Sequence, residues 1–183
     1  MYSYPTNAEL AEMVRLLSKA RMEHWIGEDF GTWRWWILLL LLIIPWFIWY
    51  KYADKKQFHE LTLFGLFIMI SSITLDELGF ELSLWNYPVD VIPLFPRLTS
   101  VDYTAVPVIH MLVYQYFSTW KSFFWAMVVK ATVFSFILEP LIVQLGFYKM
   151  IKWNHLYSFP IYIVVGLCVR WIVKKIFAIA KRG

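Results

Sequence analysis

Ionisable side chains inside long apolar stretches are the residues of this chain with the clearest chemical potential. Lys130 lies nine residues from Lys121 and nine from Glu139, in a stretch that is otherwise uncharged. In a helix this places Lys130 about 13 Å from either end. A charged amine in apolar surroundings is costly unless it is paired. We therefore consider Lys130, with His110 and Tyr114 of the preceding apolar stretch, as a candidate site that relays protons or holds an anion.

The alternative interpretation gives the same residues a packing role. Lys130 would then extend toward a polar boundary or donate to backbone carbonyls, and His110 would be a hydrogen-bonded packing residue. Nine residues make about two and a half helical turns, so Lys130 and Glu139 are expected on opposite faces of one helix. Any partner of Lys130 must therefore come from another helix.

A second group of candidates lies where apolar stretches end. It consists of Asp76, Glu77, Glu139 and Arg97. Carboxylates at one level could bind a cation through oxygen ligands, or they could cap helix ends and pair with Arg97. Because Glu139 precedes Pro140, we expect it near a kink or a helix end, which favours the structural role.

Several well-known chemistries lack their motifs. The chain has no Gly-rich phosphate loop, no HExxH and no GxSxG element, and Cys168 is its single cysteine. The four histidines have no spacing typical of a metal site: His24, His59, His110 and His155. The sequence therefore predicts no catalytic residue, no metal and no cofactor.

The elements that position these candidates are long and apolar. Residues 35–50, between Arg34 and Lys51, carry no charge, and 60% of the chain is hydrophobic and 20% aromatic. A helix over residues 35–50 would be about 24 Å long, and its aromatic ends complete most of a bilayer core of roughly 30 Å. Continuous rather than alternating apolar runs disfavour strands. The sequence predicts an all-α, polytopic transmembrane helix bundle.

Charge-free intervals predict five spans within a transmembrane domain of residues 32–183. Their approximate bounds are 33–51, 58–76, 103–119, 121–139 and 156–174. The turn near Ser118–Ser122 is very short, so the third and fourth spans are expected to be antiparallel neighbours.

Residues 1–31 precede the first span as an amphipathic segment without the apolar core of a cleaved signal peptide. Thr6 and Glu9 form a capping-box pattern that predicts a helix start. Apolar residues then follow at helical spacing: Leu10, Met13, Val14, Leu17, Ala20 and Trp25. We expect this helix to lie on the membrane surface or to dock on a partner, with a break at Gly27 and Gly31.

Five spans place the two termini on opposite sides of a membrane. The side of the carboxyl terminus collects nine basic residues against seven on the other side, so we expect a cytoplasmic carboxyl terminus and an amino terminus outside. The net charge is +4, with basic residues at the ends of apolar runs. This distribution favours anionic lipid headgroups of the bilayer over nucleic acid as the partner.

The two long connections on the outer side share an order of residue types. Each has an acid, a Gly-Phe pair, a Trp-Asn pair, a Tyr and a Pro. The first set is Asp76, Gly79, Phe80, Trp85, Asn86, Tyr87 and Pro88; the second is Glu139, Gly146, Phe147, Trp153, Asn154, Tyr157 and Pro160. The pattern indicates either a duplicated helical hairpin or a chance recurrence of frequent aromatic residues.

These motifs also carry a family resemblance. The order SSITLDELGF, WNYPV and LFPR, then KATVFSFILEP and WNHLYSF, resembles an uncharacterised family of small five-span membrane proteins common in endospore-forming bacteria, the Firmicutes. The resemblance covers residues 61–173. It implies a multi-pass protein of a bacterial plasma membrane and implies no particular activity.

Three functional classes remain open. The first, which we favour, is a non-enzymatic accessory protein or subunit of a plasma-membrane complex, whose partner is another membrane protein or a second copy of the chain. The second is a small carrier or ion-conducting protein that uses Lys130, His110 and the outer carboxylates. The third is a membrane-embedded lipid-modifying enzyme. Five short spans offer little polar lining, which disfavours the carrier.

Overall fold

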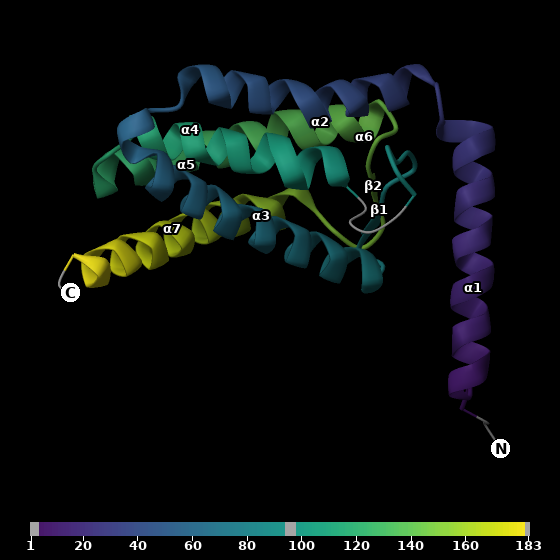
Figure 1. Ribbon diagram of the computed structural model, residues 1–183. Helices are drawn as coiled ribbons and strands as arrows, with labels where there is room; N and C mark the ends of the chain where they lie inside the picture. The colour runs from purple at the N-terminus through teal and green to yellow at the C-terminus, as the bar shows by residue number, and fades with distance from the viewer. Residues whose placement is uncertain (1–3, 94–97, 182–183) are drawn as a thin grey trace.

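The computed structural model describes residues 4–93 and 98–181, which are predominantly helical, as predicted (Figure 1). A bundle of helices forms the body of the molecule. A separate amino-terminal helix, α1 (Asn7–His24), runs across one end of this bundle rather than along it. The last bundle helix, α7 (His155–Ala180), ends at the opposite end.

The start of α1 confirms the predicted capping box. The Thr6 hydroxyl accepts a hydrogen bond from the Glu9 backbone N–H at 3.3 Å, and the Glu9 carboxylate accepts one from the Thr6 backbone N–H at 2.7 Å. The Thr6 backbone N–H and hydroxyl both donate to the Glu9 carboxylate and hold the pKa of this exposed group below its usual value. Within its described residues, α1 contains no buried side chain.

A short connection of residues 25–32, here called the elbow, joins α1 to the bundle. It contains a π-helical turn, Trp25–Asp29, and then Gly31, whose φ of +78° lies in the left-handed region that favours glycine. Thr32 ends the elbow as the N-cap of α2 (Trp33–Tyr52). The predicted break before the first apolar helix therefore falls where the glycines indicated it.

The remaining bundle helices follow the predicted apolar intervals. They are α3 (Phe58–Glu81), α4 (Val106–Tyr116), α5 (Trp120–Val133), α6 (Glu139–Gln144) and α7 (His155–Ala180). A 3₁₀ turn, Lys55–Gln57, precedes α3, and a π turn, Val101–Ala105, leads into α4. Only three residues separate α4 from α5, in agreement with the short turn expected there.

A third π turn, Phe134–Leu138, joins α5 to α6 without a break in the helical path. Glu139 has φ −58° and ψ −49°, which is ordinary helical geometry. The expectation that Pro140 disfavours helical geometry at Glu139 is therefore wrong, although Glu139 does lie where the π turn passes into α6. Pro140 lies in the first turn of α6, and the wider π turn before it accommodates the missing backbone N–H.

Two short strands bring together the connection after α3 and the connection after α6. β1 (Trp85–Asn86) pairs antiparallel with β2 (Lys149–Met150) at the bundle end that α1 crosses. The proposed repeat equates the Trp-Asn pair of β1 with residues 153–154, but the strand pairing does not use that correspondence. The two glycines of the pattern also differ, since Gly146 has φ +76° while Gly79 is helical.

Large apolar side chains lie on the outside of the bundle as well as in its core. Three helical segments of the described chain are long and apolar enough, by length and composition, to cross a membrane: Trp33–Tyr52, Lys55–Glu81 and Trp120–Gln144. Only 17% to 28% of each apolar window is buried inside the protein. A helix that is apolar all round and still outward-facing is typical of contact with lipid. Five crossings stay a prediction.

Candidate functional site

Lys130 of α5 contacts His110 of α4 in the interior of the bundle. Both residues are buried, and Lys130 Nζ lies 2.7 Å from His110 Nε2. His110 Nδ1 lies 2.7 Å from the carbonyl oxygen of Val106. A carbonyl oxygen only accepts, so Nδ1 carries the imidazole proton and Nε2 accepts from the lysine amine. The partner of Lys130 therefore comes from another helix, as expected.

The rest of the Lys130 environment is aromatic. Its amine lies 4.7 Å from the ring centre of Phe134 and 5.1 Å from that of Tyr162. Ring faces attract a cation, most strongly where water is absent. Among the described residues, no carboxylate forms an ion pair with Lys130. The amine is thus held by a neutral imidazole and two aromatic faces.

Tyr162 connects this pair to Glu139. Its hydroxyl donates to Glu139 Oε1 at 2.6 Å, while the other carboxylate oxygen lies 2.8 Å from His155 Nδ1. A regular helix would place Lys130 and Glu139 on opposite faces, but the π turn between them rotates Glu139 by roughly 100°. Glu139 therefore contacts the Tyr162 hydroxyl and Lys130 its ring face. This series of contacts, here called the polar line, runs from partly exposed His155 to buried Lys130.

A second buried group joins Asp76 of α3 to Asp102 of the π turn before α4. Tyr87 donates to Asp76 Oδ1, and Ser72 donates to Asp102 Oδ1 at 2.5 Å. The two carboxyl groups interact electrostatically, and we call them the carboxyl pair. Among the described residues, the Oδ2 atom of each is buried without a hydrogen-bond partner.

The structure does not bring Tyr114 to the Lys130–His110 pair. Tyr114 instead donates to Glu60, which also accepts from Lys174 Nζ at 2.7 Å. Arg170 lies over the Tyr114 ring at 5.0 Å and donates to the Phe117 carbonyl at 2.7 Å. These contacts fasten α3, α4 and α7 together near the end of the bundle opposite α1.

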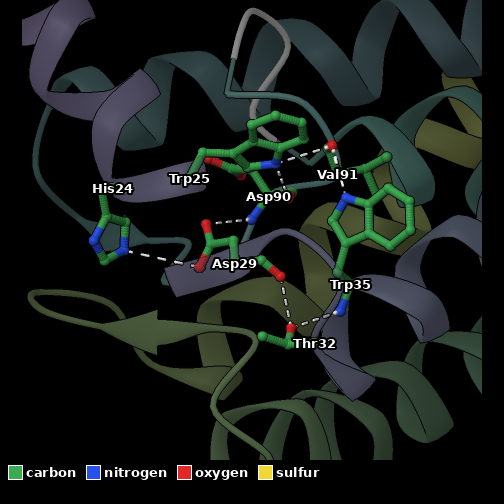
Figure 2. A network of polar contacts seen from close by, with 7 residues as sticks. All are labelled: His24, Trp25, Asp29, Thr32, Trp35, Asp90 and Val91. Carbon is green, nitrogen blue, oxygen red and sulfur yellow. Dashed lines mark hydrogen bonds and ion pairs between the residues drawn. The ribbon is translucent and has the colours of Figure 1, made fainter. Parts of the chain in front are cut away.

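The elbow is fixed to the loop that follows β1 by a network of polar contacts (Figure 2). The Trp25 indole N–H points at the carbonyls of Asp90 and Val91, at 3.0 Å and 3.1 Å, and Trp35 donates to the same Val91 carbonyl at 3.1 Å. Asp29 Oδ2 accepts from the Asp90 backbone N–H at 3.5 Å. Burial raises the pKa of the Asp29 carboxyl, and the Asp90 N–H and nearby His24 oppose that rise. The network orients α1 relative to the bundle.

The predicted loop residues have structural roles. Burial, and next the neighbouring Asp76, raise the pKa of Tyr87. The rings of Trp85 and Trp153 lie 5.0 Å apart. Others cap, pack or shape the backbone: Asn86 pairs with Lys149, Pro88 is half-buried, Asn154 caps α7, Tyr157 packs on Trp153, and Pro160 lies inside α7.

The acidic group predicted at the outer side is divided in the structure. Asp76 belongs to the carboxyl pair and Glu139 to the Tyr162 line, while Glu77 takes part in contacts of its own. Arg97 lies outside the described residues. Sequence reasoning missed Asp102, Tyr162 and His155. Asp102 had a signal, because it is the charged residue directly before a predicted span.

This arrangement holds several titratable side chains at fixed places, but it does not resemble a metal centre. Within the described part of the chain, no three His, Cys, Asp or Glu side chains gather as a metal site would require. Comparisons of the whole chain with protein-family models, curated proteins and solved structures find no match.

Proposed function

We propose that this chain is a five-span protein of a bacterial plasma membrane and that it acts as a non-enzymatic accessory subunit of a membrane complex. The observation that carries the proposal is α1, a helix of 18 residues that buries none of its side chains yet is held in place by the elbow. Because α1 adds no side chain to the protein core and is nevertheless held in a fixed orientation, it is suited to contacts outside the protein.

Helix lengths support five crossings. In addition to the three apolar segments already described, α7 has 26 residues and would extend about 39 Å. The π turn and α4 together, residues 101–116, would extend about 24 Å. Polar residues at each end can reach the headgroups and so compensate for the shorter length. An odd number of crossings places α1 and the end of α7 on opposite sides, with the basic carboxyl-terminal residues in the cytoplasm.

The orientation of α1 supports contact with the outer surface of the bilayer. Its apolar stripe of Leu10, Met13, Val14 and Leu17 is 46% to 63% exposed. Arg21 follows Leu17 by four residues and so lies on the same face, and its guanidinium lies 5.7 Å from the Phe80 ring at the outer end of α3. The stripe therefore faces the side on which the bundle lies. The amino-terminal half of α1 extends past the bundle, where lipid would lie beneath it (Figure 1).

The opposite face of α1 is charged and suits a protein partner. Glu12 and Arg15 form an ion pair at 2.6 Å, and Lys19 and Glu23 form another at 3.7 Å. Both pairs are largely exposed, so they contribute little to stability and are open to exchange for contacts with another chain. We propose that this face meets another membrane protein or a second copy of the chain.

Deletion of residues 1–20 tests the accessory function. This cut removes the stripe and leaves Arg21 and the whole elbow, so the bundle is expected to fold. We expect crosslinking in native membranes and purification in mild detergent to yield a specific partner, and the deletion to lose it. No partner with the full-length chain, or an undiminished partner with the deletion, contradicts the proposal.

Matched substitutions separate the two faces of α1. Val14→Lys and Leu17→Lys place charge on the stripe and should loosen the helix from the membrane. Ala8→Lys adds the same charge on the opposite face and should leave the membrane contact unchanged. In intact membranes, protease should cleave α1 faster in Val14→Lys and Leu17→Lys than in Ala8→Lys.

A second candidate function, the small carrier, is favoured by the Lys130–His110 pair and its connection through Tyr162 to Glu139. Proton flux into liposomes that contain the purified protein tests it. Selective loss of flux in Lys130→Met, with folding intact, would replace the accessory function by transport. Glu9→Gln, on α1 and remote from this line, is the control.

A further inference from the structure

A groove of about 580 Å³ lies between α5 and α7, near the end of the bundle opposite α1. It is lined by Trp120, Lys121, Phe124, Leu167, Cys168 and Trp171, and its surface is almost wholly apolar. Its volume falls within the range of sites that bind small molecules, about 300–1,000 Å³. The polar line and the carboxyl pair described above do not include these residues.

Lys121, the one charged residue among the described residues that line the groove, lies at one of its ends. Lys121 belongs to the first turn of α5, and Trp171 approaches the same level from α7, which runs in the opposite direction. Phe124 and Leu167 lie about one turn deeper along their helices. The groove thus combines a charged mouth with an apolar body, the arrangement that an amphiphile with an anionic head requires.

The positive charge at the mouth is not neutralised within the described chain. Lys121 is exposed and forms no ion pair among the described residues, whereas nearby Lys174 is engaged by Glu60 at 2.7 Å. The Lys175 amine lies 5.9 Å from the Trp171 ring centre, so a second cation stands beside the groove. α5 also begins here, and the amino-terminal end of a helix of 14 residues favours an anion.

We propose that this groove binds one anionic phospholipid of the inner leaflet, with its phosphate at Lys121 and an acyl chain along Phe124 and Leu167. The proposal rests on the membrane location proposed above, in which this end of the bundle faces the cytoplasm. Anionic lipids give the cytoplasmic leaflet its negative surface potential and are the headgroups that basic residues attract there.

Native mass spectrometry of the full-length protein tests the site. The protein in neutral detergent is titrated with dioleoyl phosphatidylglycerol and, separately, with dioleoyl phosphatidylcholine. We expect one tightly held phosphatidylglycerol, preferred at least about fivefold, and loss of most of that preference in Lys121→Ala. A fivefold change corresponds to about 1 kcal/mol per basic residue at a membrane surface.

Two further variants make the result specific. Lys121→Arg should retain the preference, and Lys56→Ala, which removes another exposed basic residue outside the groove, should leave it unchanged. Equal affinity of the unmodified protein for both lipids overturns the proposal. An effect of Lys56→Ala as large as that of Lys121→Ala does so too, because it reveals diffuse charge attraction.

Cys168, the single cysteine of the chain, supplies a second readout inside the groove. Phosphatidylglycerol should slow maleimide labelling of Cys168, and phosphatidylcholine should not. A Cys168–Cys168 disulfide dimer formed on mild oxidation in membranes would show that a second copy covers the groove and would overturn the lipid site. Release of the protein by alkaline carbonate refutes the membrane location itself, whereas an embedded protein without lipid preference refutes only this inference.

Discussion

Removal of the Lys130–His110 contact by a double-mutant cycle is the sharpest test of how the buried site is held. The variants are Lys130→Met, His110→Leu and the pair together. Each single change leaves one buried polar atom without its partner, either the lysine amine or His110 Nε2. The double change removes both and keeps approximately the same volume.

The geometry sets the expected magnitudes. His110→Leu should lower the free energy of unfolding by about 1.5–3 kcal/mol, because a buried amine loses its acceptor, and Lys130→Met by about 1–3 kcal/mol. The double variant should be nearly as stable as the unmodified protein, since replacement of both partners by apolar groups is close to neutral. A coupling free energy of about 2.5–6 kcal/mol follows. Ordinary polar pairs between transmembrane helices average only about 0.6 kcal/mol.

Equilibrium unfolding in mixed micelles, followed by circular dichroism at increasing denaturing detergent, measures these differences. If the losses of the two single variants simply add in the double variant, the residues do not interact. That result would refute the assignment of His110 Nε2 as the acceptor of Lys130. A coupling near 0.6 kcal/mol would be that of an ordinary polar contact between helices, and the Lys130–His110 pair would then have no special role.

Three further predictions concern the end of the bundle that α1 crosses. Gly79→Ala should destabilise the fold by about 1–3 kcal/mol in the same unfolding assay, because the added methyl group would lie 1.9 Å from the Trp85 ring. Trp25→Phe removes the indole N–H that donates to the Asp90 and Val91 carbonyls. In hydrogen exchange, the free energy of local opening of the elbow should fall by about 0.5–1.5 kcal/mol, so its amides should exchange faster. Asp29→Asn should raise the melting temperature at pH 7, because burial raises the pKa of Asp29 and disfavours its charged form in the fold. The gain should shrink as the pH falls through the raised pKa toward about 4, where the carboxyl group of the unfolded chain is protonated as well; a constant difference would contradict this reasoning.

Local features of the fold could be predicted from the sequence where one physical rule dominates. The capping box at Thr6 and Glu9 needs only a spacing of three residues, and the apolar intervals fix where helices form. The short turn before Trp120 follows from the length of chain available. The π turn at Phe134–Leu138 could not be foreseen, because it depends on how α5 and α6 pack around Pro140.

The candidate site was only partly accessible to sequence reasoning. Depth along a helix can be counted, which placed His110, Lys130 and Tyr114 at similar levels. The direction of a side chain around its helix depends on tertiary packing, and Tyr114 turns toward Glu60 instead. The electrostatic interaction of Asp102 with Asp76 joins residues from two elements whose relative placement no local pattern specifies.

The most direct test of the account is the accessibility of the two chain ends from outside intact cells. In a Cys168→Ser background, Ser18→Cys places a thiol on α1 and Ala180→Cys places one at the end of α7. With a membrane-impermeant maleimide, we predict that intact cells label only the thiol at position 18, and that the thiol at position 180 reacts only after permeabilisation. Labelling of both positions in intact cells, or of neither until permeabilisation, would contradict the five crossings.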